Sequence, residues 1–254
     1  MTHFERRKGT ELDNIERLNE VLRNSKDTVF FGGAGVSTES GIPDFRGESG
    51  LFSVAFDYPP ETVLSHRFFT KRPEVFWEFY FQRMVYTDAK PNQAHLKLAE
   101  MEKAGKLAAV ITQNIDGLHQ AAGSRIVFEL HGSIHRNYCM ECGKFFPLEY
   151  IYKFKNTTRK PVCDECGGII KPDVVLYQEP LDQVLFSNAV KKVEEAEVLL
   201  VGGTSLNVYP AAGLLRHFNG DHLILINKSA TRFDANADIV IHGKIGEILS
   251  QVDI

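Results

Sequence analysis

Residues 28–37, Thr-Val-Phe-Phe-Gly-Gly-Ala-Gly-Val-Ser, decide the fold of this 254-residue chain. The stretch begins as a short apolar run of β-forming residues, which predicts a buried strand, and continues into closely spaced glycines. Glycines directly after a first strand let the backbone approach a pyrophosphate, and the next helix N-terminus favours its charge. Because the spacing is not Gly-x-Gly-x-x-Gly, this stretch alone leaves dinucleotide binding and an ordinary tight turn both open.

Similar short apolar runs follow along the chain and alternate with helical patterns. Strands are expected at 107–111, 126–130, 174–177, 198–201, 223–226 and 239–241, and helices at 11–24, 93–104, 184–195 and 210–218. Fully apolar strands that alternate with helices predict a parallel sheet covered on both faces. Two insertions interrupt this pattern, an aromatic-rich one at 45–90 and a second at 131–168.

The composition is that of a water-soluble globular protein. The chain is 43% hydrophobic and 24% charged, with a net charge of −4. This balance does not indicate a nucleic-acid or membrane partner, and no apolar run approaches the roughly 18 residues of a membrane span. The first residues lack the apolar segment of a secretory signal, so we expect a cytoplasmic location.

All four cysteines lie in the second insertion, as Cys139-x2-Cys142 and Cys163-x2-Cys166. In a chain expected in the cytoplasm, such pairing indicates a metal rather than disulfides. Four thiolates can close a tetrahedral zinc site with no open position, so the predicted zinc is structural. A redox role for one Cys-x-x-Cys is the minor alternative.

Polar motifs follow three of the predicted strands. Residues 112–119 read Thr-Gln-Asn-Ile-Asp-Gly-Leu-His, residues 129–133 read Glu-Leu-His-Gly-Ser, and residues 202–206 read Gly-Gly-Thr-Ser-Leu. In an open α/β sheet, ligands bind at the carboxyl ends of the strands, although a generic polar turn remains possible for each motif. His131 is a general-base candidate because its ordinary pKa lies near neutrality, and His119 and His135 are its competitors.

Taken in order, these motifs resemble the sirtuin family, in its bacterial type. The glycine turn runs on to Ser40-Gly-Ile-Pro-Asp-Phe-Arg46, and the resemblance extends from about residue 11 to residue 250. It implies an α/β fold, a Rossmann-like parallel sheet with a small zinc-binding domain formed by two insertions. The implied NAD-binding domain comprises 1–44, 91–130 and 169–254. The implied small domain comprises 45–90 and 131–168, with a cofactor loop, a helical insertion and the zinc module.

The resemblance also implies site roles. His131 would be the general base, and Asn114 would lie by it at the ribose and nicotinamide. The implied NAD contacts are Ala34, Thr38, Phe45, Arg46, Gln113, Ile115, Asp116, Thr204, Ser205, Asn227 and Lys244. Val174 and Val175 would hold the substrate backbone as an added strand. The zinc ligands would be Cys139, Cys142, Cys163 and Cys166.

The implied activity is NAD-dependent deacetylation, or more broadly deacylation, of lysine in proteins. NAD would be consumed as a co-substrate, yielding nicotinamide, O-acyl-ADP-ribose and free lysine, and the zinc would take no part. A protein mono-ADP-ribosyltransferase on the same scaffold is the first alternative. An NAD-dependent dehydrogenase would need Gly-x-Gly-x-x-Gly and a second substrate domain. A zinc-ribbon binding module would leave the other motifs unexplained.

Several positions bear on how this chain departs from the family pattern and on which acyl group it removes. Gly32 stands where the family often has threonine, and Gln178 where it usually has glycine. Tyr80-x-x-Arg83 resembles the pair that desuccinylases use for a terminal carboxylate, and i, i+3 spacing places both on one helix face. Against this, Pro43-Asp-Phe-Arg46 resembles deacetylase-type members, so acidic-acyl removal is expected only as a secondary activity. The alternative is that Tyr80 belongs to a core with arginine at its rim.

Overall fold

A computed structural model describes residues 11–45, 50, 56–157 and 159–254. Its larger part is a six-stranded sheet with the order β3-β2-β1-β7-β8-β9, in which every neighbouring pair is parallel. The strands are β1 (Thr28–Gly32), β2 (Leu107–Thr112), β3 (Val127–Glu129), β7 (Val198–Gly202), β8 (His222–Asn227) and β9 (Ile239–His242).

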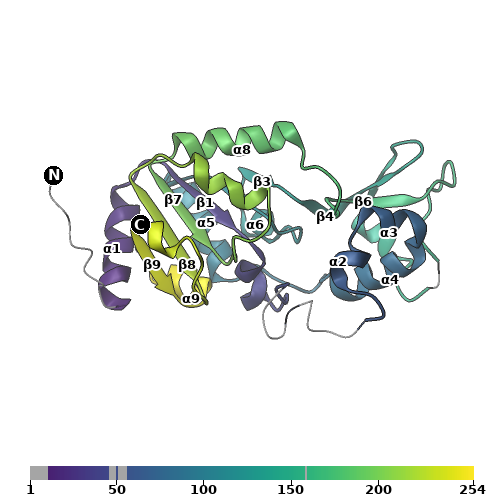
Figure 1. Ribbon diagram of the computed structural model, residues 1–254, viewed down its shortest axis with the longest axis horizontal. Coiled ribbons are helices and arrows are strands. Elements are labelled where there is room, and N and C mark those ends of the chain that lie inside the picture. Colours follow the sequence, from purple (N-terminus) through teal and green to yellow (C-terminus); the bar gives the residue numbers. More distant parts are fainter. Residues whose placement is uncertain (1–10, 46–49, 51–55, 158) are drawn as a thin grey trace.

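The sheet is apolar because helices cover both of its faces. All five residues of β1 and of β7 are buried, and Phe30 is in register with Val110 on one side and Leu200 on the other. One face packs against α1 (Glu11–Asn24), α5 (Gln93–Lys103) and α9 (Ile245–Leu249), and the other against α8 (Gln183–Glu195) and η3 (Ala211–His217). Figure 1 shows this layered unit at one end of an elongated molecule.

At the other end of the molecule is a smaller unit with its own sheet. β4 (Gly132–Cys139) lies between β5 (Phe145–Pro147) and β6 (Ile170–Val174), and both pairings are antiparallel. Four short helices complete this unit: α2 (Pro60–Val63), α3 (His66–Lys71), α4 (Pro73–Arg83) and α7 (Leu148–Tyr152).

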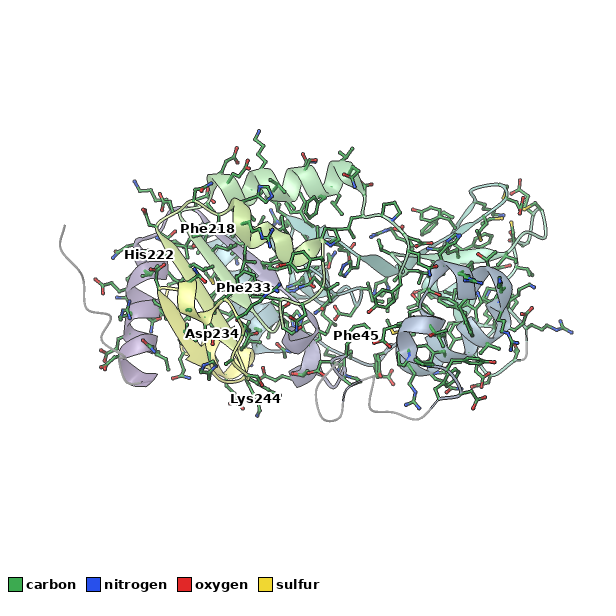
Figure 2. All side chains as sticks on the ribbon, in the orientation of Figure 1. Phe45, Phe218, His222, Phe233, Asp234 and Lys244 are labelled. Atoms are coloured by element: carbon green, nitrogen blue, oxygen red, sulfur yellow. The ribbon has the colours of Figure 1, made fainter. Side chains whose placement is uncertain are left out.

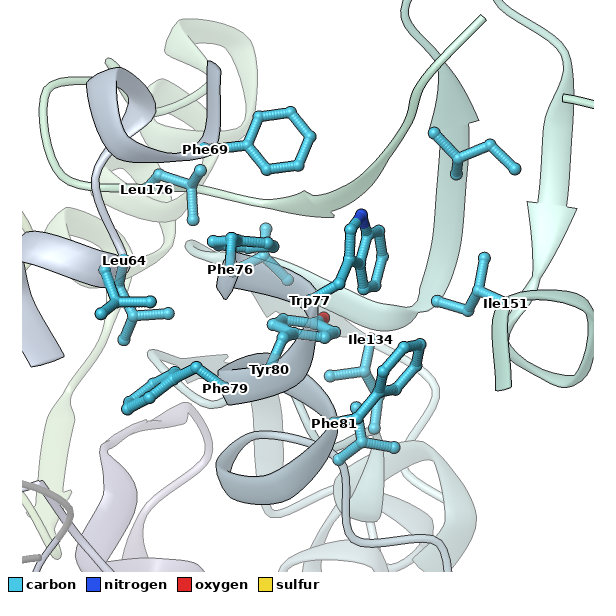
Figure 3. Packing of buried hydrophobic residues seen from close by; sticks show 14 of the residues in the cluster. Leu64, Phe69, Phe76, Trp77, Phe79, Tyr80, Phe81, Ile134, Ile151 and Leu176 are labelled. Atoms are coloured by element: carbon cyan, nitrogen blue, oxygen red, sulfur yellow. The ribbon is translucent and has the colours of Figure 1, made fainter. Parts of the chain in front are cut away.

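The small unit has a separate aromatic core, shown in Figure 3. Phe76, Trp77 and Tyr80 project from α4 with ring centroids 5.2–5.7 Å apart and pack toward Ile134 and Ile151. Both insertions contribute to this core, so each needs the other in order to bury its apolar side chains.

The predicted fold class is confirmed, with differences in detail. The strand expected at 174–177 instead ends at Val174 and joins the small sheet, where residues 170–174 alternate between buried and half-buried positions. After β1 the chain forms a 3-10 helix, η1 (Ala34–Ser40), and a short helix α6 (Leu118–Ala122) begins at the end of the polar motif at residues 112–119. The predicted domain boundaries remain a prediction, although residues 170–176 pack with the small unit.

Among the described residues, no helix combines the length and apolar character needed to cross a membrane.

Candidate active site

The strand order reverses direction between β1 and β7, and the glycine-rich turns after these two strands touch. A β-carbon at Gly33 would lie 2.9 Å from Cβ of Thr204, and one at Gly203 would lie 2.4 Å from the Val36 nitrogen. Gly203 also has a φ of +59°, a conformation that side chains disfavour. Gly33 and Gly203 therefore place backbone, without side chains, at the point where open α/β sheets bind ligands.

A cleft of about 640 Å³ begins at this point and extends to the small unit. The lining includes nearly all of the predicted site residues: Ala34, Thr38, Phe45, Arg83, Gln113, Asn114, Ile115, Asp116, His131, Val174, Val175, Thr204, Ser205, Asn227 and Lys244. Figure 2 shows Phe45 near the junction of the two units and Lys244 on the side of the large sheet. Arg46 lies outside the described residues, and Tyr80 does not line the cleft.

The floor of the cleft is a network of polar side chains from two turns. Ser37 Oγ donates to Asp116 Oδ2 at 2.6 Å, and Asn114 Nδ2 donates to Ser37 Oγ at 3.1 Å. Burial raises the pKa of Asp116, while the hydrogen bonds from Ser37 and from the Leu118 backbone act in the opposite direction. Sequence reasoning did not assign Ser37 a role, although its place in the glycine turn was a usable signal.

A second chain of hydrogen bonds joins the turns after β2, β7 and β8. Gln113 Nε2 donates to Thr204 Oγ1 at 3.0 Å, and the Thr204 backbone N–H donates to Asn227 Oδ1 at 2.8 Å. Asn227 is 8% exposed, and its Nδ2 has no hydrogen-bond partner within the described part of the chain. A buried donor without a partner at a cleft wall fits a ligand that carries acceptor oxygens.

His131 is held in one tautomer. Its Nδ1 lies 3.0 Å from the carbonyl oxygen of Gln113, which can only accept, so Nδ1 carries the proton and Nε2 is left with a free lone pair. Burial lowers the pKa of His131, although the Gln113 hydrogen bond partly opposes this effect. The ring is therefore neutral near pH 7 and able to accept a proton.

The two competing histidines are placed differently. His119 is 1% exposed and lies against His95, with ring centroids 4.7 Å apart. His135 Nε2 lies 3.1 Å from the carbonyl oxygen of Asp116. Neither His119 nor His135 lines the cleft, so His131 is the histidine positioned for chemistry there.

The four cysteines come together at the far end of the small unit. Their sulfurs lie within 4.8 Å of one another, with Cys139–Cys166 at 3.4 Å and Cys142–Cys163 at 3.7 Å. Tetrahedral zinc with a Zn–S bond of about 2.3 Å requires sulfurs about 3.8 Å apart, so the cluster fits one structural zinc.

The local backbone explains why these cysteines converge. In each Cys-x-x-Cys turn, the first cysteine accepts a backbone hydrogen bond from the glycine four residues on, Gly143 or Gly167. Gly143 and Gly167 have φ values of +72° and +74°. The two turns therefore share one geometry and present their thiols to a common centre.

Tyr80 and Arg83 occupy different environments, although both belong to α4. The Tyr80 side chain is fully buried in the aromatic core, and its hydroxyl has no partner within the described residues. Arg83, the last residue of α4, lines the cleft, and the described residues include no ion-pair partner for it. The Tyr80 hydroxyl is therefore not available to a ligand in the cleft.

The chain leaves β6 along the edge of the cleft. Val174, Val175 and Gln178 all line it. Gln178 has a φ of +76°, which is unusual for a residue other than glycine, and its Oε1 accepts a hydrogen bond from the Arg67 backbone N–H at 3.2 Å. This bond holds the Gln178 side chain against α3.

The fold and cleft define a Rossmann-like class of nucleotide-binding protein with an added zinc module. The Sir2 family model matches residues 33–210, and the chain belongs to this family. The resemblance to sirtuins is thereby confirmed.

Bacterial relatives match over almost their whole length. A protein named NAD-dependent protein deacetylase from Clostridium acetobutylicum is 60% identical over 243 residues, covering 95% of this chain and 98% of the relative. One of the same name from Cutibacterium acnes is 51% identical over 239 residues, covering 93% and 96%.

Solved structures agree in fold. A chain from work described as "Structural Basis for the Mechanism and Regulation of Sir2 Enzymes" has a TM-score of 0.86 and 43% identity, covering 94% of this chain and 96% of that one. A Sir2 variant with a deacetylated p53 peptide and 3'-O-acetyl ADP ribose has a TM-score of 0.86 and 38% identity, covering 93% and 96%.

Proposed function

We propose that this protein is an NAD-dependent protein-lysine deacetylase that releases nicotinamide, O-acetyl-ADP-ribose and free lysine. The observation that carries the proposal is His131, a neutral histidine whose Nδ1 is fixed by Gln113 and which lines the cleft. The names of the bacterial relatives support the same activity.

The turns after β1, β7 and β8 are the proposed NAD site. Gly33 and Gly203 let the backbone approach the phosphates, with Ala34 and Thr38 beside them in η1. Asn227 Nδ2 and the turn with Thr204 would bind the adenosine ribose, because a buried donor without a partner requires an acceptor. We also propose that Ser205 and Lys244, whose side chain pairs with Glu247, contact the adenosine half.

The polar floor would receive the nicotinamide end. Asp116 and Ser37 are held by their mutual hydrogen bond, and Asn114 is oriented by Ser37. Side chains held in this way can recognise a carboxamide without having to be ordered by the ligand. Ile115, on the same turn, would add an apolar contact, and Phe45 would cover the site from the junction of the two units.

When bound, NAD supplies the leaving nicotinamide and the ribose that accepts the acyl group. His131 Nε2 would take a proton from a ribose hydroxyl, while Nδ1 keeps its own proton and donates it in a hydrogen bond to the Gln113 carbonyl oxygen. Because burial favours the neutral ring, this base needs no prior deprotonation at pH 7. The acyl-lysine would lie along Val174 and Val175, with its backbone as an added strand.

A mass-spectrometric assay of acetyl-, succinyl- and long-chain acyl-lysine peptides, with and without NAD, tests the proposal. We expect NAD-dependent loss of the acetyl group with one nicotinamide released per lysine. Nicotinamide release without acyl loss, accompanied by ADP-ribose on a protein, would replace it with the mono-ADP-ribosyltransferase alternative. Acetyl loss that does not need NAD would also overturn it.

One observation favours acidic acyl groups as secondary substrates. Arg83 brings a positive charge into the cleft, and no carboxylate among the described residues pairs with it. A guanidinium can hold a terminal carboxylate by two parallel hydrogen bonds. We therefore propose weak desuccinylation that depends on Arg83 and not on the buried Tyr80 hydroxyl.

A further inference from the structure

Arg136 bridges the two units of the molecule immediately behind the active site. Its Nη1 donates to Glu129 Oε2 at 2.6 Å, and its Nε donates to Asp173 Oδ2 at 2.7 Å. Glu129 ends β3 in the large sheet, whereas Arg136 and Asp173 lie on β4 and β6 of the small sheet. One guanidinium thus holds three strands from two sheets.

This bridge is partly shielded from water. The Glu129 side chain is 9% exposed, while those of Arg136 and Asp173 are 38% and 42% exposed. Hydrogen bonds between charged groups are stronger than neutral ones, and salt screens a shielded pair less than a surface pair. The Glu129 contact is therefore the stronger constraint, and the contact with the more exposed Asp173 adds a second one.

The residues held by the bridge flank the proposed catalytic groups. His131 comes two residues after Glu129, and Val174 and Val175 directly follow Asp173. These two segments are in contact, because the Val175 backbone N–H donates to the His131 carbonyl oxygen at 3.0 Å. The bridge therefore clamps the segment that carries the base against the segment proposed to carry the substrate.

The backbone between these segments has little space to adjust. Gly132 has a φ of +79°, and a β-carbon there would lie 1.8 Å from the carbonyl oxygen of Asp173. A small rotation of β6 relative to β3 would change this contact and would move the His131 ring relative to Val174. The spacing between base and substrate thus depends on what holds β6 in place.

We infer that Arg136 is a positioning residue for deacylation, which sets the distance between His131 and an acyl-lysine bound along Val174 and Val175. Arg136 does not line the cleft, so it acts through Glu129 and Asp173 and not on the substrate. The inference rests on the proposed function. Arginine suits the role because its rigid planar fork fixes the directions of two hydrogen-bonded carboxylates, whereas the ammonium of lysine is a point charge on a flexible stem.

The test compares Arg136→Met with Lys144→Met in the full-length, zinc-loaded protein. Lys144 is a matched control, since its side chain is equally exposed at 38% and it also pairs with two carboxylates, Asp164 and Glu165, but both lie within the zinc module. For Arg136→Met we expect kcat/KM for an acetyl-lysine peptide to fall at least about tenfold, because small displacements of reacting groups are costly. The KM for NAD and the zinc content should stay within about twofold of the parent, a pattern that general loss of structure would not produce.

Two further variants keep the test decisive if Arg136→Met folds poorly. Asp173→Asn removes the charge of the more exposed anchor while keeping its size, and should give a smaller loss of kcat/KM in the same direction. Arg136→Lys should recover only part of the activity. Folded Arg136→Met or Asp173→Asn protein with parental peptide kinetics would overturn the inference, whereas a parent enzyme inactive on every acyl peptide would overturn the proposed function instead.

Discussion

Two histidines buried under the active-site turns make the stability of this protein depend on pH. His95 and His119 are 0% and 1% exposed, and burial lowers their pKa values to about 4 and about 3. The His95 Nδ1 accepts a hydrogen bond from the Asn92 backbone N–H, so protonation there would also break the N-terminal cap of α5. Both rings are therefore neutral in the folded state and become charged more readily in the unfolded chain.

The direction in which stability changes with pH follows from proton binding. Below an unfolded pKa of about 6.5, the unfolded state binds two protons that the folded state does not, so the free energy of unfolding decreases as pH falls from 6.5 toward 4. The limiting slope is about 1.4 kcal/mol per pH unit for each ring. Between pH 7.5 and 5.5, the pair should cost about 3 kcal/mol of stability.

His119→Leu isolates this effect, because neither ring nitrogen of His119 has a hydrogen-bond partner among the described residues. The variant should be at least as stable as the parent at pH 7.5 and should lose about 1.4 kcal/mol less stability than the parent by pH 5.5.

Urea unfolding at pH 7.5, 6.5 and 5.5 gives the required free energies. Circular dichroism would follow the whole chain, and the fluorescence of Trp77, the single tryptophan, would follow the small unit. If the parent and His119→Leu lose the same stability across this pH range, the buried histidine pair is not the source of the pH dependence.

Three further predictions concern the site. His131→Ala should lose about 10²- to 10⁴-fold in kcat, while calorimetry should still detect NAD binding. In the parent enzyme, the acid limb of the pH profile of kcat/KM should lie below pH 6.5. Burial lowers the His131 pKa, so the active neutral form persists to lower pH. Cys163→Ala should no longer bind stoichiometric zinc, as metal analysis would show. The lost metal contributes on the order of 10 kcal/mol of apparent binding energy to folding, so soluble yield should fall before the chemistry is affected. Arg83→Met should reduce desuccinylation far more than deacetylation, and Tyr80→Phe should change neither, as paired peptide assays would reveal.

Much of the site could be predicted because a parallel sheet leaves a recognisable pattern of apolar strands and helices in the sequence. Short apolar runs marked the strands, and residues that follow parallel strands must meet at one edge of the sheet. This rule brought Gln113, Thr204 and Asn227 into one hydrogen-bonded chain although they lie far apart in sequence. The cysteine cluster was equally predictable, because its geometry is built into two local turns.

What could not be predicted depends on side-chain direction and long-range packing. The spacing of Tyr80 and Arg83 placed both on one helix face, yet Tyr80 completes an aromatic core assembled with the other insertion, while Arg83 at the helix end reaches the cleft. The observed strand at 170–174 reads Ile-Lys-Pro-Asp-Val, so it lacks the apolar signal that predicted a strand at 174–177, and it pairs with the small sheet. The Arg136 bridge joins residues 129 and 173, which no local pattern relates.

The order of strands in the large sheet bears on how the chain can fold during synthesis. β1 lies at the centre of the sheet, yet its neighbour β7 begins at Val198 of 254 residues, so more than three quarters of the protein must leave the ribosome before that edge is paired. Until then, Val29, Phe30 and Phe31 lie on an apolar strand with one open edge, which favours association with other nascent chains. Polypeptides stalled before Val198 should therefore depend on chaperones, whereas release beyond His242 lets all six strands of the sheet pair.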